Sequence, residues 1–305
     1  MRAHSIRDVI VRPPSTDEVQ KYARRALRFA DAVGQLPTPI DDLLEAARIG
    51  NLKIDEEVKQ NFAVRLKAAA RQEFNSMWQK IRGIADLRER VTYVDEKTTP
   101  TRIRFAKGHE LGHQVLPWHR LDPGRFDDDK SLTWEAEEIF DTEANLFSAE
   151  VLFQGNNFTR LVRDYAVGFD SIFNLADMHE ASRHATAWRY VEEQDESVAL
   201  VTYWPSKFNA EMLRRGKVVK SRNFLRKFSE IDLPPNLGPD HDWTTTHASD
   251  PVYGDTISLA CGKAEFRFEW EAWWNGYVQL VLLRHKPKFH IVRDLADRVT
   301  VASGR

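Results

Sequence analysis

The sequence has little cysteine, no long apolar run and no excess of charge of one sign. Cys261 is the single cysteine among 305 residues, which excludes an intramolecular disulfide and suits a reducing compartment. The stretch MRAHSIRDVIVRPPSTDEV at the N-terminus lacks the apolar core of a signal peptide, and no apolar run approaches the roughly 18 residues that span a bilayer. We therefore expect a cytoplasmic protein that does not enter a membrane.

The charges of the two signs nearly cancel. There are 44 Lys and Arg against 46 Asp and Glu, so the composition does not favour nucleic acid or an anionic membrane as a partner. Hydrophobic residues make up 42% and charged residues 30%, as in globular proteins generally, and the chain is long enough for two domains. Binding partners must therefore be inferred from motifs.

The apolar pattern divides the chain into three parts. Residues 1–15, with Pro13 and Pro14, are expected to form a flexible arm. Residues 16–194 are mainly helical with a few short strands; their first helix has the apolar spacing Tyr22, Ala26, Phe29 and Val33. Residues 195–305 are rich in alternating β-like segments, and Asn275-Gly276 between two of them predicts a hairpin. The predicted fold class is α+β: a mainly helical domain with a small sheet, followed by a β-rich C-terminal domain.

The segment RIRFAKGHELGHQVL contains the motif H-E-x-x-H at His109, Glu110 and His113. On a helix, two histidines four positions apart lie on one face, where both rings can reach one Zn²⁺, and the glutamate can take a proton from zinc-bound water. The competing interpretation is a solvated helix with two unrelated histidines. A hydrolytic site keeps three protein ligands and leaves the fourth position to water, so a third ligand is needed.

His119 is one candidate for the third ligand. It falls where the longer metzincin pattern has its third histidine, but that pattern requires a glycine at the position held here by Leu116. Without glycine the chain does not easily turn sharply enough to bring His119 back towards the two histidines of the motif.

Glu143, in TWEAEEIFDTEANLFSAEVLF, is the other candidate. On a helical projection it lies within an apolar stripe, while Asp141 points the other way. A carboxylate on a buried face is costly unless it is paired or bound to metal. Glu150 shares the stripe and is the reserve candidate. The alternative for either glutamate is a structural salt bridge, for example to Arg102 or Arg104. The other stripe residues are Ala136, Ile139, Phe140, Leu146 and Phe147.

The blocks RFAKGHELGHQVLP and EANLFSAEVLF resemble the ImmA/IrrE family of zinc metallopeptidases. Three further blocks agree in order: LPTPIDDLLEAARIGNLKI, IRGIADLRERVTYVDE and LADMHEASRHATAWRYVEE, which extend the resemblance over residues 20 to 193. Gly108 stands where the family usually has alanine, and Phe153-Gln154 replaces Met-Pro. The β-rich part after residue 195 has no comparable resemblance.

The resemblance implies an ImmA/IrrE-like metallopeptidase domain over residues 16–194, with Zn²⁺ held by His109, His113 and Glu143 and with Glu110 as the general base. It also implies a protein substrate such as a helix-turn-helix transcriptional repressor, cleaved in a stress response or in the induction of a mobile element. The strand at residues 91–95 is expected either to pair with an extended substrate or to be internal to its sheet. The pattern does not identify the donor that stabilises the oxyanion.

Two further expectations concern the remaining segments. The helix pair at residues 170–193 also has the outline of a DNA-binding helix-turn-helix, so the alternative is a non-catalytic, metal-binding transcriptional regulator. Its acidic residues offset Arg183 and Arg189, which argues against direct nucleic-acid binding. The β-rich domain, with its cluster of Trp270, Trp273, Trp274 and Tyr277, is expected to form a sandwich core or to bind a small-molecule or protein trigger or the substrate.

Overall fold

The structure is a computed structural model that describes residues 15–53, 83–86, 90–94, 97–120, 130–209, 211–228, 230–246 and 249–286. The predicted flexible arm lies outside these residues except for Ser15. The chain forms two compact units, Met1–Ala166 with Asp170–Glu193, and Val167–Phe169 with Gln194–Arg305. The predicted α+β class is confirmed. No described helix is both long and apolar enough to cross a membrane.

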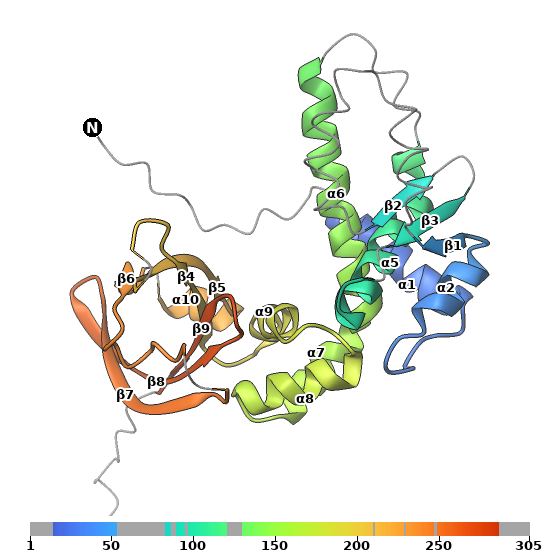
Figure 1. Ribbon diagram of the computed structural model, residues 1–305. Helices are drawn as coiled ribbons and strands as arrows, with labels where there is room; N and C mark the ends of the chain where they lie inside the picture. Colours follow the sequence, from blue (N-terminus) through green and yellow to red (C-terminus); the bar gives the residue numbers. More distant parts are fainter. Residues whose placement is uncertain are drawn as a thin grey trace, which may run out of the picture. The chain divides into compact units, whose positions relative to one another are not determined.

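The first unit is mainly helical and also contains a small sheet (Figure 1). Its helices are α1 (Thr16–Phe29), α2 (Ile40–Ala46), α5 (Pro100–Val115), the 3₁₀ helix η1 (Pro117–Arg120), α6 (Lys130–Phe153), α7 (Asn156–Asp164), α8 (Phe169–His179) and α9 (Arg183–Glu193). Its strands are β1 (Gly50–Lys53), β2 (Gly83–Asp86) and β3 (Val91–Val94).

The three strands lie in the order β1-β3-β2, with β1 parallel and β2 antiparallel to β3. Among the described strands β3 is therefore internal, which decides between the two expectations for residues 91–95. The edge strand β2 contacts α5. An extended peptide can add a strand at an edge but not at β3.

Helix α1 buries a different stripe from the predicted one. Val19, Ala23 and Leu27 are the buried residues, whereas Phe29 is 74% and Val33 is 55% exposed. The helix ends at Phe29, so the predicted stripe runs past its end. Tyr22 and Ala26 are only partly buried.

Helices α5 and α6 approach each other closely because α5 carries two glycines at the contact. A Cβ atom at Gly108 would lie 2.5 Å from Oγ of Ser148, and one at Gly112 would lie 3.2 Å from Cα of Ala144 and 3.2 Å from Cβ of Phe147. Ser148 also donates a hydrogen bond of 2.8 Å to the carbonyl of Phe105. This contact places one face of α5 directly beside one face of α6.

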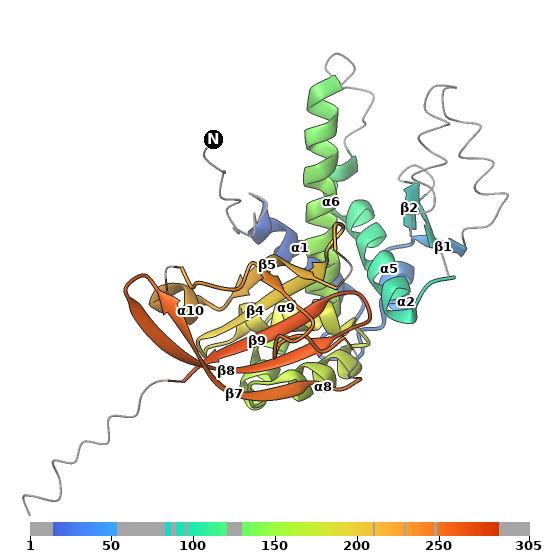
Figure 2. The same ribbon diagram turned by 60° about the vertical axis from the view of Figure 1, so that its left-hand side comes forward.

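The second unit contains helix α10 (Arg222–Lys227) and the strands β4 (Val198–Pro205), β5 (Leu213–Lys220), β6 (Asn236–Leu237), β7 (Val252–Cys261), β8 (Ala264–Trp274) and β9 (Gln279–His285). The strands form an antiparallel sheet in the order β6-β5-β4-β9-β8-β7 (Figure 2). The hairpin predicted at Asn275-Gly276 joins β8 to β9, with Gly276 at φ +93°. Trp270 and Trp273 are 8% and 6% exposed, in keeping with a core role.

The close contact at Gly112 predicts that Gly112→Val is destabilising. The added side chain meets the backbone of α6, so the free energy of unfolding should fall by about 1–3 kcal/mol. Arg102→Val, which puts the same residue at an exposed position of α5, is the matched control and should change it by no more than about 0.5 kcal/mol. The measurement is urea-induced unfolding followed by circular dichroism, and equal midpoints for the two variants would contradict the packing argument.

Candidate metal centre

Helix α5 presents the two histidines of the H-E-x-x-H motif. It begins at Pro100, whose fixed φ suits the first helical turn, and ends at Val115, before Leu116 becomes extended ahead of Pro117. His109 and His113 are one turn apart, and their Nε2 atoms are 3.1 Å from each other. Both rings therefore turn the same nitrogen towards one point.

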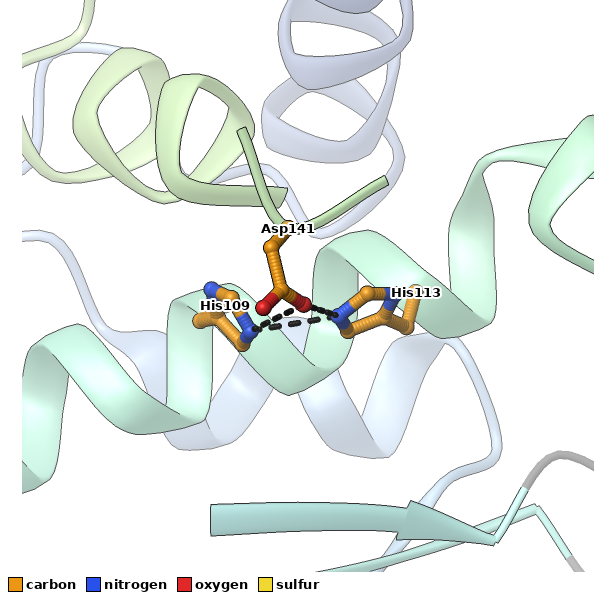
Figure 3. A group of neighbouring side chains, drawn as sticks. All are labelled: His109, His113 and Asp141. Carbon is orange, nitrogen blue, oxygen red and sulfur yellow. Dashed lines mark hydrogen bonds and ion pairs between the residues drawn. The ribbon is translucent and has the colours of Figure 1, made fainter. Parts of the chain in front are cut away.

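Asp141 of α6 reaches the same point (Figure 3). Its Oδ1 is 3.6 Å from Nε2 of His113 and 3.9 Å from Nε2 of His109. A triangle with sides of 3.1, 3.6 and 3.9 Å has its centre about 2.1 Å from each corner, which matches the distances of Zn²⁺ from nitrogen and carboxylate ligands. Among the described residues, these three side chains form the group that could hold a metal ion.

Asn145, one turn beyond Asp141 on α6, orients the first histidine. Its Oδ1 lies 3.0 Å from Nδ1 of His109. An amide oxygen can only accept here, so Nδ1 of His109 carries the proton and Nε2 keeps its lone pair for a metal. Asp141 and Asn145 thus act on His109 from one face of α6.

The protonation states of these groups suit a cation. Burial, and then the neighbouring His113, lower the pKa of His109 to about 4, so its imidazole is neutral at neutral pH. The neighbouring His113 is the main cause that lowers the pKa of Asp141, which favours its ionised form. Metal binding requires neutral histidine and an ionised carboxylate. The donor set of two imidazoles and one carboxylate fits Zn²⁺.

Glu143, predicted as the third ligand, lies at a different place. The residue is 3% exposed, and its carboxylate accepts from three donors: Ser15 through Oγ, Trp118 through Nε1 at 2.6 Å, and His119 through Nε2 at 2.8 Å. The structure therefore places Asp141, which the helical projection directed away from the buried stripe, beside the histidine pair. Because α6 is contacted by α5 and also by α1, it has more than one buried face, which a single apolar stripe does not reveal.

The other candidates also have structural partners. His119 lies behind His113, with its Nδ1 3.0 Å from Nδ1 of His113 rather than near the Nε2 atoms. Glu150 forms an ion pair of 2.8 Å with Arg189 and accepts from Gln20 at 3.2 Å. The salt bridge expected for Glu150 thus exists, with Arg189 as its partner.

Arg102 and Arg104, the arginines expected as alternative salt-bridge partners of Glu143 or Glu150, do not fill that role. Arg104 pairs with Glu180 at 3.4 Å, and Arg102 lies on the exposed side of α5.

Glu110, the predicted general base, is 5% exposed. Burial, followed by the negative charge of Asp141, raises its pKa to about 8. A carboxylate with such a pKa binds a proton readily, as a general base in hydrolysis must. A bound cation would oppose this shift because it stabilises the ionised form.

The pKa of Glu110 predicts how stability depends on pH in the metal-free protein. The folded-state pKa, about 8, lies above the ordinary value of 4.5, so stabilisation by this proton is complete below pH 4.5 and is lost as the pH rises through 8. With chelator present, the wild type should lose stability relative to Glu110→Gln over this interval, because glutamine does not titrate. Urea midpoints measured at several pH values test this, and a constant difference between the two proteins would contradict it.

The positions of Asp141 and Glu143 predict opposite effects of two matched substitutions. Asp141→Asn should weaken Zn²⁺ binding by more than the roughly 10–100-fold typical of outer-shell changes, because it removes the charge of a candidate ligand. Glu143→Gln should weaken it less, because the amide oxygen can still accept from His119. Competition with a chromophoric chelator gives both affinities. The reverse order would transfer the ligand role to Glu143.

Comparison with known proteins adds a likeness of fold. No family model and no curated protein matches the chain. Among solved structures, a "Mycobacterium tuberculosis transcriptional regulator" superimposes with a TM-score of 0.51 at 12% identity, covering 94% of this chain and 92% of that chain. At this identity the likeness concerns the fold alone.

Proposed function

We propose that the chain is a zinc-dependent endopeptidase of the ImmA/IrrE type. The observation that carries the proposal is the convergence of His109, His113 and Asp141 on one point, with Glu110 next to the first histidine on the same helix. The order of sequence blocks that resemble the family supports the same assignment. In this proposal the third ligand is Asp141, because it lies beside the histidine pair, in place of Glu143, which the resemblance implied.

A bound Zn²⁺ would acidify a water molecule and polarise the scissile carbonyl group. The residues of the chain supply the remaining steps. Glu110 takes the proton from the attacking water and passes it to the leaving amine, so the peptide bond breaks with one water consumed. Asn145 keeps the ring of His109 in one orientation throughout. An extended substrate would add to β2, the described edge strand that contacts α5.

The proposed substrate is a regulatory protein, such as a helix-turn-helix repressor. This part rests on the resemblance. The proposed trigger, a small molecule or protein that binds the β-rich domain, likewise remains a prediction.

A non-catalytic transcriptional regulator is the second candidate function. The succession of α8 and α9 motivates it, and the superimposable Mycobacterium tuberculosis structure, whose likeness concerns the fold alone, is named a transcriptional regulator. Against it, Arg189 of α9 is held by Glu150 at 2.8 Å and by Glu193 at 3.2 Å, so its charge is already neutralised. Salt-dependent binding to duplex DNA, measured by fluorescence anisotropy, would favour this function over proteolysis.

Glu110→Gln tests the proposed peptidase. Glutamine keeps the size of the side chain but cannot accept the proton, so cleavage of a helix-turn-helix repressor that the wild type cleaves should fall by about 10²–10⁴-fold. Zinc content, measured by elemental analysis, should stay at the wild-type value. Wild-type cleavage by a zinc-loaded Glu110→Gln protein would contradict the assigned role, and a wild-type protein that holds no zinc would contradict the proposal as a whole.

A further inference from the structure

A continuous line of hydrogen bonds joins a buried carboxylate to one of the candidate metal ligands. Oε2 of Glu143 lies 2.8 Å from Nε2 of His119, and Nδ1 of His119 lies 3.0 Å from Nδ1 of His113. Nε2 of His113 then faces Nε2 of His109 at the candidate metal position. The line therefore approaches the metal position from behind His113.

The hydrogen-bonding chemistry of the line determines where each proton lies. An ionised Glu143 only accepts, so Nε2 of His119 donates and its Nδ1 keeps a lone pair. That lone pair accepts from Nδ1 of His113, which leaves Nε2 of His113 unprotonated and directed at the metal position. Asn145 imposes the same tautomer on His109. Both histidines are thus prepared for a cation before it binds.

The surroundings hold this line in one geometry. The side chains of His119 and Glu143 are 1% and 4% exposed, so water scarcely competes for their hydrogen bonds. The ring of Phe140 lies 4.5 Å from that of His119, centroid to centroid. Trp118 and Ser15 donate to the Glu143 carboxylate, and both are neutral. A neutral set of partners leaves the negative charge of Glu143 uncancelled next to the cation site.

We infer that His119 and Glu143 are positioning residues, which act through His113 to present its Nε2 to the metal. The inference rests on the proposed metal site but not on peptide hydrolysis. It also explains why a carboxylate occupies the buried stripe of α6. His119 does not bind the metal in this arrangement, because its Nδ1 faces the far side of the His113 ring.

Two substitutions of His119 separate positioning from simple packing. His119→Phe keeps an aromatic ring beside Phe140 but removes both nitrogens. His119→Gln loses the ring but keeps one acceptor for His113 and one donor for Glu143. If His119 only fills space, phenylalanine is the better replacement. If it positions His113, glutamine is the better one.

The experiment measures Zn²⁺ affinity of the full chain by competition with a chelator, alongside thermal unfolding of the metal-free proteins. His119→Phe should bind Zn²⁺ about 10–100-fold more weakly than wild type, as for other outer-shell partners of metal-bound histidine, and His119→Gln should recover most of the loss. Glu143→Gln should have a smaller effect than His119→Phe and serves as the second variant if the phenylalanine protein does not fold.

The outcomes separate this inference from the proposed function. Unchanged Zn²⁺ affinity in His119→Phe, or affinities that follow the unfolding temperatures rather than hydrogen-bonding capacity, would overturn the positioning role. A Glu143→Gln loss as large as that of Asp141→Asn would also overturn it, because Glu143 would then be a ligand. Zinc binding with the expected order but without peptide cleavage would support the positioning role and reject only the peptidase. A wild-type protein without zinc affinity would reject both.

Discussion

The contact between α5 and α6 at Gly108 and Gly112 is the constraint on which the candidate metal centre depends. The absence of side chains there lets the helices approach until a Cβ atom would touch Ser148 or the backbone of Ala144. This close approach brings the short side chains of Asp141 and Asn145 within reach of the histidines on the neighbouring helix. The candidate ligands thus come from two helices, and the close packing of these helices sets their spacing.

Two buried glutamates of α6 are accommodated in different ways, with different consequences for charge. Glu150 is paired with Arg189, so its charge is cancelled within the unit. Glu143 accepts from donors that are neutral at neutral pH. His119 is among them because burial lowers the pKa of its imidazole. A carboxylate without a cationic partner is costly to bury, but beside a cation site its field favours the ion. A cation bound at the candidate site would offset the cost of burying Glu143.

The second unit uses its aromatic residues mainly for its own core. Trp270 is buried in it, and Trp273 donates through Nε1 to the carbonyl of Ser249 at 3.3 Å. Tyr277, in the hairpin loop, is 73% exposed. The tryptophans that form a cluster in the sequence thus lie mainly on the buried side of the sheet. The cluster therefore does not indicate an exposed aromatic surface.

The sequence by itself determined the parts that depend on local spacing. The shared face of His109 and His113 follows from their spacing of four positions on a helix. The β8–β9 hairpin follows from Asn275-Gly276, and the α+β division follows from the change in the period of apolar residues. Tertiary structure decided which face of α1 is buried, whether β3 is an edge, and which carboxylate meets the histidines. A helical projection shows which residues share a face, but it does not show which neighbour covers that face. Helix α6 is contacted by both α5 and α1, so Asp141 and Glu143, on different faces, could be assigned only once those neighbours were in place.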